Sequence, residues 1–237
     1  MHFQFTSKHQ QGASETRRSR GQGPVTRRPR LSLPDRTPLR FEAAPARRSG
    51  ALAYERRIQS DGVIEFRAGH WHDFANALAW LAFPLSKAAL NAVHLRDGRG
   101  TAPNARSRAR DAATLVDEAG LIFACVDAEL IALLRAWQWR ALFWARRDAV
   151  ARGVRAIVIG HGVLERLRAP HRALTAQALI VDTEADDLDA IAAATIRAPD
   201  FGSHRLTPLP IAALPGWDSE QIGERLFDDH DVFRVKR

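Results

Sequence analysis

The sequence predicts an α+β fold that is rich in helix, with the helices packed on a small sheet of two to four short strands. Two adjacent segments between residues 70 and 96 repeat their apolar residues at helical spacing, and residues 127–152 do the same over a longer stretch. Short β-branched runs bounded by glycine occupy residues 154–159 and 176–181. A chain of 237 residues is long enough for one domain with a substantial core.

The N-terminal part of the chain has a different composition from the rest. Residues 1–48 are rich in Arg, Ser, Gly, Gln and Pro and contain few large apolar side chains. Such a segment buries too little surface to offset its loss of conformational entropy, so we predict a disordered basic tail followed by a single globular domain at 49–237. The first elements expected are a short helix or strand at 54–58 and an extended piece at 62–66, after a Ser-Asp-Gly turn.

Two consecutive helices are predicted around Pro84, because proline ends the preceding helix and is tolerated as the first residue of the next. At about 100° per residue, each helix carries one polar stripe on an otherwise apolar surface. The stripes consist of His72, Asp73, Asn76 and Trp80 in the first helix and of Lys87, Asn91 and His94 in the second. Consecutive helices with a short connection usually pack together, so we expect the two stripes to face one shared hollow.

The remaining elements follow from capping residues, glycines and β-branched runs. We expect a helix at 105–116 capped by Asn104, and a buried strand or the lead into a helix at 121–126. One long helix capped by Asp127 should run to about Arg152. A strand at 154–159, a helix at 163–168 and a strand at 176–181 should form a β-α-β unit with a short crossover, followed by a helix at 186–195 and a proline-rich strap at 208–217.

The net charge of +8 is confined to the tail. Residues 1–50 contain 11 Lys and Arg and 3 Asp and Glu, whereas the remaining residues contain 24 of each kind. The folded body therefore has no overall basic bias, and a weak nonspecific contact with nucleic acid is expected only through residues 1–48, with a merely solvated tail or an overextended start as the favoured alternatives.

The cellular setting is predicted from what the sequence lacks. A single cysteine excludes a disulfide framework and fits a reducing compartment. No apolar run approaches the roughly 18 residues of a spanning helix, and the N-terminus has no secretory h-region. We expect a cytoplasmic protein without a membrane contact.

The two polar stripes are the strongest candidate site. His72 or His94 would act as general base or metal ligand, because imidazole titrates near neutral pH, and Asp73 would orient or co-ligate. Lys87, Asn76 and Asn91 would bind an oxyanion. The alternative, given equal weight, is a helix cap at Asp73 and a hydrogen-bonded structural network.

Two further motifs add candidates. Asp117 and Glu118 would supply carboxylates to a divalent metal, although an acidic pair ahead of a glycine is more often a solvated helix end. His161 follows a predicted strand, where α/β sheets present ligand-binding residues, and Glu165 lies one turn later. Gly160 and Gly162 would let the backbone approach an anion, and a tight turn capped by His161 is the equal alternative.

The chain resembles a bacterial family known as domain of unknown function 3025. The resemblance covers roughly residues 52–217 and is most specific at WHDxxNALxWxxFPxxKxxLNxxH, residues 71–94. Its other parts begin at Tyr54-Glu55, Arg110-Asp111, Gly160-His161 and Pro208-Leu209-Pro210. The resemblance implies no reaction.

Two functions are compatible with these patterns. The first is a hydrolase or nuclease-like enzyme, aided by a divalent metal ion or not, acting on a small molecule or a phosphate- or carbonyl-bearing substrate through the His, Asp, Asn and Lys cluster. The second is a non-catalytic binding module, associated with RNA or the ribosome through the basic tail. A shared pocket lined by the named residues would favour the enzyme.

Overall fold

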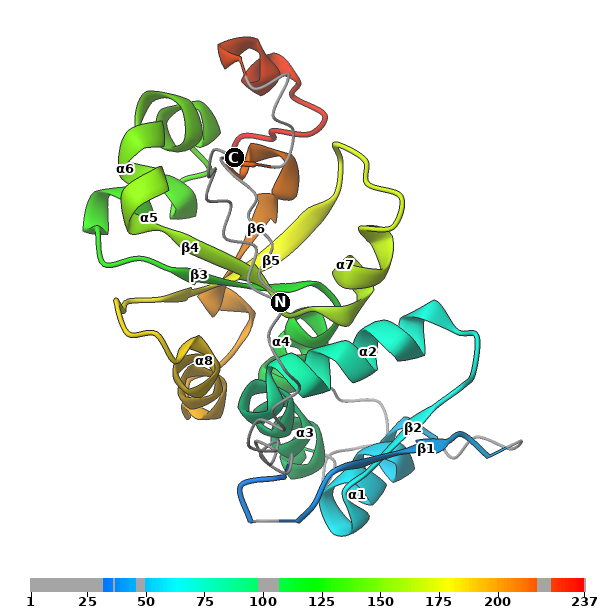
Figure 1. The fold of residues 1–237 in the computed structure, drawn as a ribbon. Helices are drawn as coiled ribbons and strands as arrows, with labels where there is room; N and C mark the ends of the chain where they lie inside the picture. Colours follow the sequence, from blue (N-terminus) through cyan, green and yellow to red (C-terminus); the bar gives the residue numbers. More distant parts are fainter. Residues whose placement is uncertain (1–31, 36, 46–49, 98–106, 217–222, 237) are drawn as a thin grey trace, which may run out of the picture.

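The computed structural model describes residues 32–35, 37–45, 50–97, 107–216 and 223–236. The helices are α1 (Ala51–Asp61), α2 (Trp71–Ala82), α3 (Pro84–Asp97), α4 (Arg108–Ala119), α5 (Ala128–Arg135), α6 (Arg147–Gly153), α7 (His161–Arg166) and α8 (Leu188–Arg197), with a π-helical segment at Ala141–Ala145 and 3-10 turns at Ser203–Arg205, Ile211–Ala213 and Glu224–Asp228. The strands are β1 (Arg40–Ala43), β2 (Val63–Phe66), β3 (Gly120–Ala124), β4 (Arg155–Val158), β5 (Thr175–Val181) and β6 (Leu206–Pro210). The predicted α+β class is confirmed (Figure 1).

A four-stranded sheet in the order β4-β3-β5-β6 forms the centre of the larger unit. Side chains alternate across its strands: Leu121 and Phe123 of β3 face a core with α5 and α6, whereas Ile122 and Ala124 face a core with α3, α4 and α8. Both faces of β3 are therefore covered, which explains why all five of its residues are buried.

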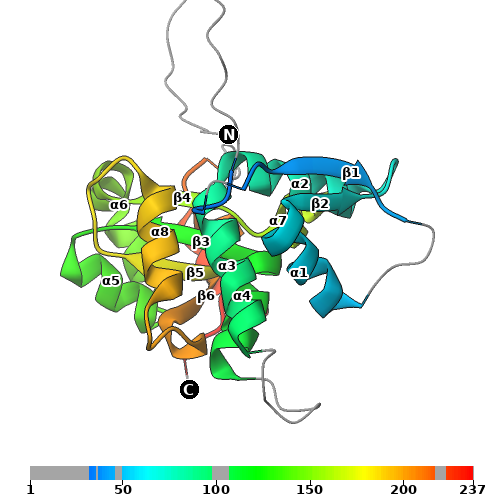
Figure 2. The same ribbon diagram turned by 90° about the horizontal axis from the view of Figure 1, so that it is seen from below.

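A second, smaller unit consists of β1, β2 and α1 and packs against α2 and α3. Strands β1 and β2 pair in parallel, and Ile58, Ile64 and Trp80 form its core together with Leu33 and Ala88. Figure 2 shows this unit beside the larger sheet, with α3 lying between the two. Helix α3 contributes to the cores of both units, and α2 packs on α7 of the larger one.

The structure corrects several predicted elements. Order begins before residue 49, because β1 pairs with β2 and Leu33 is buried, while residues 1–31 lie outside the described residues and their predicted disorder stays a prediction. The segment at 54–58 is part of helix α1. Helix α4 begins at Arg108 with Ser107 as its N-cap, and the predicted cap Asn104 lies outside the described residues, as does residue 217 at the end of the predicted strap.

The long helix predicted at 127–152 is wrong, because the chain breaks after α5. Trp137 adopts a left-handed backbone with φ of 56°, after which a π-helical segment precedes α6. The break lets Trp139 enter the core, where its Nε1 donates to the carbonyl of Arg234 at 2.7 Å. A tertiary contact with the chain terminus thus overrides the local helical pattern.

The predicted β-α-β unit is also wrong. Strand β4 runs antiparallel to β3, while β5 runs parallel to β3 on its other side, so β4 and β5 are antiparallel to each other and not adjacent. The short helix α7 buries Val163 in the core beside the sheet and packs on α2 and α4. This arrangement carries His161 toward the candidate site.

No helix of the described residues is both long and apolar enough to cross a membrane.

We predict that Gly160→Ala lowers the free energy of unfolding by at least about 2 kcal/mol. A Cβ at this position would lie 2.3 Å from the backbone nitrogen of Gly120 and 2.6 Å from the carbonyl carbon of Ala119, so rigid backbone would have to move. Chemical denaturation measures the effect. Gly153→Ala is the matched control, because nothing lies within 4 Å of its added Cβ, and equal stability of the two variants would contradict the prediction.

Candidate functional site

Helix α2 lies between two polar clusters. The first, which we call the histidine–glutamate cluster, consists of His72, Glu118 and His161, from α2, α4 and α7. The second consists of the residues that line a small cavity between α1, α2, α3 and α4. Asp117 contacts both clusters.

Three ligand-type atoms of the histidine–glutamate cluster lie close together. His161 Nε2 is 3.0 Å from His72 Nε2 and 3.4 Å from Glu118 Oε1, and the third distance, from His72 Nε2 to Glu118 Oε1, is 3.9 Å. The His161 side chain is buried, whereas those of His72 and Glu118 are 41% and 50% exposed. One side of the triangle is therefore open to solvent.

Glycines bring the three elements into contact. The amides of Ile159 and Gly160 both donate to the carbonyl of Gly120, at 3.0 and 2.9 Å, so the end of α4 and the start of α7 lie side by side. A Cβ on Gly162 would lie 2.6 Å from Glu118 Oε2. The carboxylate of Glu118 thus occupies space that only a glycine at this position leaves free.

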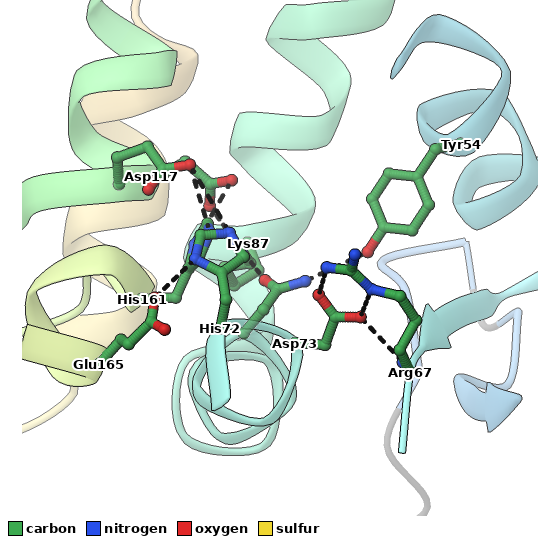
Figure 3. Close-up of polar contacts among 10 residues, drawn as sticks. Tyr54, Arg67, His72, Asp73, Lys87, Asp117, His161 and Glu165 are labelled. Carbon is green, nitrogen blue, oxygen red and sulfur yellow. Dashed lines mark hydrogen bonds and ion pairs between the residues drawn. The ribbon is translucent and has the colours of Figure 1, made fainter. Parts of the chain in front are cut away.

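A carboxylate lies near the other ring nitrogen of each histidine, but only His72 is within hydrogen-bond distance of it, because the buried His161 Nδ1 has no hydrogen-bond partner among the described residues. His72 Nδ1 lies 3.0 Å from Glu165 Oε2, one turn along α7, and His161 Nδ1 lies 3.8 Å from Asp117 Oδ2. Figure 3 shows His72, His161, Asp117 and Glu165 grouped on one side of α2. Hydrogen bonding to His161 lowers the pKa of Glu118, so this carboxyl is ionised at neutral pH.

Lys87 lies in the second cluster beside Asp117, the residue that contacts both clusters. Its buried ammonium donates to Asp117 Oδ1 and, at 2.7 Å, to Asn76 Oδ1, whose amide Nδ2 donates to the Tyr54 hydroxyl at 3.2 Å. Burial acts to raise the pKa of Asp117, but the charges of Lys87 and His161 lower it below its ordinary value. Burial raises the pKa of Tyr54 as well, so its hydroxyl stays protonated.

The second cluster surrounds a cavity of about 20 Å³. Its lining residues are Tyr54, Glu55, Ile58, Asn76, Trp80, Lys87, Leu90, Asn91, His94 and Asp117. Asn91 Nδ2 donates to both the carbonyl and the carboxyl Oε2 of Glu55, at 2.9 and 2.6 Å. Burial raises the pKa of Glu55 to about 7, with the charge of Asp117 adding to the rise against the opposing effects of Asn91 and Lys87.

The comparisons with known proteins identify a family. A family model described as "Protein of unknown function (DUF3025)" matches residues 39–237. The chain belongs to this family. The match confirms the resemblance predicted from the sequence and extends it to include β1. No curated protein and no solved structure matches the chain.

The DUF3025 domain brings most of the predicted site residues together, but in two groups. His72, Glu118, His161 and Glu165 form one group, and Asn76, Lys87, Asn91, His94 and Asp117 line the cavity. The polar stripes of α2 and α3 do meet, through Asn76 and Lys87. His94 is not part of the three-residue group that could hold a metal ion within the described residues.

Asp73 stands apart from both groups. It accepts hydrogen bonds from Arg67, from the backbone amide at 2.8 Å and from Nε and Nη2 at 2.7 and 2.8 Å. Figure 3 shows Asp73 directed toward Arg67 and away from His72. Asp73 is not the helix cap either, because His70 occupies the N-cap position and Asp73 is the third residue of α2. It fixes the loop that leads from β2 into α2.

The structure adds residues that the sequence patterns did not single out. Tyr54 and Glu55 lie on α1, for which no polar stripe was predicted, and only the family resemblance marked them, while Arg67 lies in the loop after β2. The preferred interpretation of Asp117 as a solvated helix end is wrong, because Asp117 pairs with the buried Lys87. Gly160 is packed against the backbone of Ala119 and Gly120, and Gly162 against the carboxylate and carbonyl of Glu118, so protein atoms fill the space where an anion contact was one of two alternatives.

We predict that Lys87→Met destabilises the domain by about 3 kcal/mol, because the variant leaves Asp117 without its cation beside a cavity. Thermal or chemical denaturation at neutral pH measures the loss. The double variant Lys87→Met/Asp117→Asn should recover part of it, since the unpaired charge is removed. A double variant no more stable than Lys87→Met would contradict the charge-pair explanation.

Proposed function

We propose that this protein is a metal-dependent hydrolase in which His72, His161 and Glu118 bind one zinc-like divalent ion. The observation that carries the proposal is the triangle of His72 Nε2, His161 Nε2 and Glu118 Oε1, with sides of 3.0, 3.4 and 3.9 Å. Zinc binds nitrogen and oxygen ligands at about 2.0–2.2 Å in tetrahedral geometry, which separates the ligand atoms by about 3.4 Å. The triangle thus has the size of three corners of such a tetrahedron.

The surroundings support a catalytic rather than a structural ion. Structural zinc sites are closed by four protein ligands, whereas catalytic sites have three and keep one position for water. Here the partly exposed side chains of His72 and Glu118 leave the fourth direction toward solvent. The carboxylate of Glu165 lies 3.0 Å from His72 Nδ1, where a second-shell group orients a ligating histidine, whereas Asp117 faces His161 Nδ1 from 3.8 Å, beyond hydrogen-bond distance.

The chemistry follows from the ion and its open position. A bound zinc lowers the pKa of its water to about 7, which supplies hydroxide at neutral pH. The hydroxide oxygen would bond to a phosphorus or a carbonyl carbon, the bond to the leaving group would break, and the leaving group would take up a proton. Lys87 does not bind the substrate in this proposal, because its buried ammonium is already bonded to Asp117 and Asn76.

We predict that the tag-free, metal-stripped protein binds one equivalent of Zn²⁺ or Co²⁺, measured by calorimetry and by the visible spectrum of the Co²⁺ form. His72→Ala, His161→Ala and Glu118→Gln should abolish stoichiometric binding, and Glu165→Gln should weaken it about 10–100-fold, since it removes a second-shell partner. His230→Ala is the matched control, because His230 is exposed and lies outside the cluster.

A variant that keeps all three ligands tests the geometry itself. Gly162→Ala should also weaken binding, because the added methyl group displaces the Glu118 carboxylate, whereas Gly153→Ala should not. If the folded wild-type protein binds no stoichiometric metal, the metal centre is refuted, and the contact between His72 and His161 is only a hydrogen bond.

We predict that the Zn²⁺-loaded protein hydrolyses at least one member of a panel of p-nitrophenyl phosphate, bis-p-nitrophenyl phosphate and p-nitrophenyl acetate. Glu118→Gln and metal removal should abolish turnover, and His230→Ala should leave it unchanged. The release of nitrophenolate is followed by absorbance. A rate equal in the wild-type protein and in Glu118→Gln would exclude the cluster as the source of the activity.

A further inference from the structure

The cavity beside the histidine–glutamate cluster contains a buried acceptor without a donor. Asn91 is 2% exposed, and its side-chain Nδ2 donates to both the carbonyl and the carboxyl group of Glu55. Its Oδ1 has no hydrogen-bond partner among the described residues. A buried amide oxygen left without a donor is destabilising, so a donor is expected at this position.

The neighbouring carboxyl group of Glu55 also lacks hydrogen-bond donors. An ionised carboxylate offers about four acceptor positions, yet the hydrogen bond to the Glu55 carboxyl comes from Asn91 Nδ2. Within the described residues Glu55 has no ion-pair partner at hydrogen-bond distance. The ammonium of Lys87, which also lines the cavity, donates to Asp117 and Asn76 instead. The geometry therefore disfavours the charged form of Glu55.

We propose that Glu55 is a proton-storing residue: it is held as a neutral carboxylic acid whose O–H gives Asn91 Oδ1 its missing donor, either directly or across one cavity water. With the observed bond from Asn91 Nδ2 to Glu55 Oε2, this completes a reciprocal acid–amide pair. The cavity of about 20 Å³ has room for about one water molecule. A single proton thus gives Asn91 Oδ1 its donor and removes the unpaired charge of Glu55.

The charges around Glu55 agree with a proton that is exchanged near neutral pH. Lys87 and His94 face the cavity from α3, Asp117 faces it from α4 and Tyr54 from α1, while Arg110 of α4 acts at longer range. Burial and the charge of Asp117 raise the pKa of Glu55 to about 7, against Asn91, Lys87 and Arg110. An acid with this pKa is matched to proton transfer at neutral pH.

The use of the stored proton rests on the proposed function, whereas its presence does not. Asp117 lines the cavity and also lies 3.8 Å from His161 Nδ1, so the store is one residue away from the proposed metal ligand. Hydrolysis releases a leaving group that needs a proton. In this role Glu55 would pass its proton through the cavity water to the leaving group and take one up again from solvent, so it supplies a proton without touching the substrate.

Infrared difference spectroscopy of the folded protein against Glu55→Gln tests the presence of the proton without any metal or substrate. We expect the wild-type protein to show a carbonyl band of a protonated carboxylic acid that the variant lacks, and we expect this band to disappear with a midpoint near pH 7. The control is Glu65→Gln, because Glu65 is also buried but pairs with Arg57, and it should remove only carboxylate bands. A wild-type spectrum with ionised Glu55 at pH 5.5 would overturn the proposal.

Unfolding experiments provide an independent readout with a defined sign. The folded pKa of about 7 lies above the ordinary value of 4.5, so the folded state holds this proton more tightly and loses stability as the pH rises between these values. The stability of Glu55→Gln relative to the wild-type protein should therefore increase from pH 4.5 to 7 and stay constant above. A pH-independent difference would overturn the proposal.

The role in catalysis is measured separately with the Zn²⁺-loaded enzyme. Wild-type turnover should fall as the pH rises through 7 on a limb that Glu55→Gln lacks, with both proteins equally loaded. If the infrared band is present but the two pH profiles coincide, the proton supply is refuted while the stored proton stands. If the wild-type protein has no turnover on any substrate, the proposed function fails, and the infrared result still decides the protonation of Glu55.

Discussion

The arrangement of the candidate site depends on one backbone contact, the close approach of Gly120 and Gly160. Helix α4 ends where β3 begins, and β4 ends just before α7 begins, so pairing of the two antiparallel strands brings both helix ends together. Two amides converge on the carbonyl of Gly120 at this junction. Glu118 and His161, which are 43 residues apart in the chain, become neighbours because side chains larger than hydrogen would hold the two backbones apart.

The main unfavourable contribution to this arrangement is the burial of the Lys87 ammonium. An ammonium buried to 5% exposure is stable only when its donors are used, and here Asp117 and Asn76 accept from it. Both acceptors belong to other helices, so Lys87 of α3 ties α2 to α4. The apolar faces of these helices pack in cores that do not need this contact for their hydrophobic burial. Removal of either partner of this ion pair would leave the other charge buried and unpaired.

The sequence was sufficient to predict the parts of the site that follow from helical periodicity. The spacing of Asn76 and Lys87 around Pro84 predicted that two polar stripes would meet, and they do. Strand pairing is not encoded in this local pattern, so the antiparallel orientation of β4 and the proximity of Glu118 to His161 could not be predicted. The partner of Asp73 was missed for a similar reason, because Arg67 lies in a loop without periodicity.

Tertiary contacts also overrode local preference where the fold differs from the prediction. The apolar pattern through residue 137 favours a continuous helix, yet the anchoring of Trp139 on the carbonyl of Arg234 requires a break. The residues of β1 lie in a segment rich in Arg and Pro, whose composition predicts a disordered tail. Backbone hydrogen bonds pair β1 with β2, and composition does not reveal such bonds. In each case the deciding partner is distant in sequence.

The shared position of Asp117 makes the two polar clusters parts of one electrostatic system. Its carboxylate accepts a hydrogen bond from Lys87 on the cavity side and faces His161 on the other side. A charge added beside His161 therefore changes the energy of the ion pair between Asp117 and Lys87, and a charge added at Glu55 acts on the same carboxylate. Coupling of this kind is reciprocal in free energy. A neutral Glu55 therefore helps to keep Lys87 bonded to Asp117, since an anionic Glu55 would compete for the same ammonium across a cavity with room for about one water. The two clusters, which the sequence presented as one polar surface, are thus separate in geometry but joined through a single carboxylate.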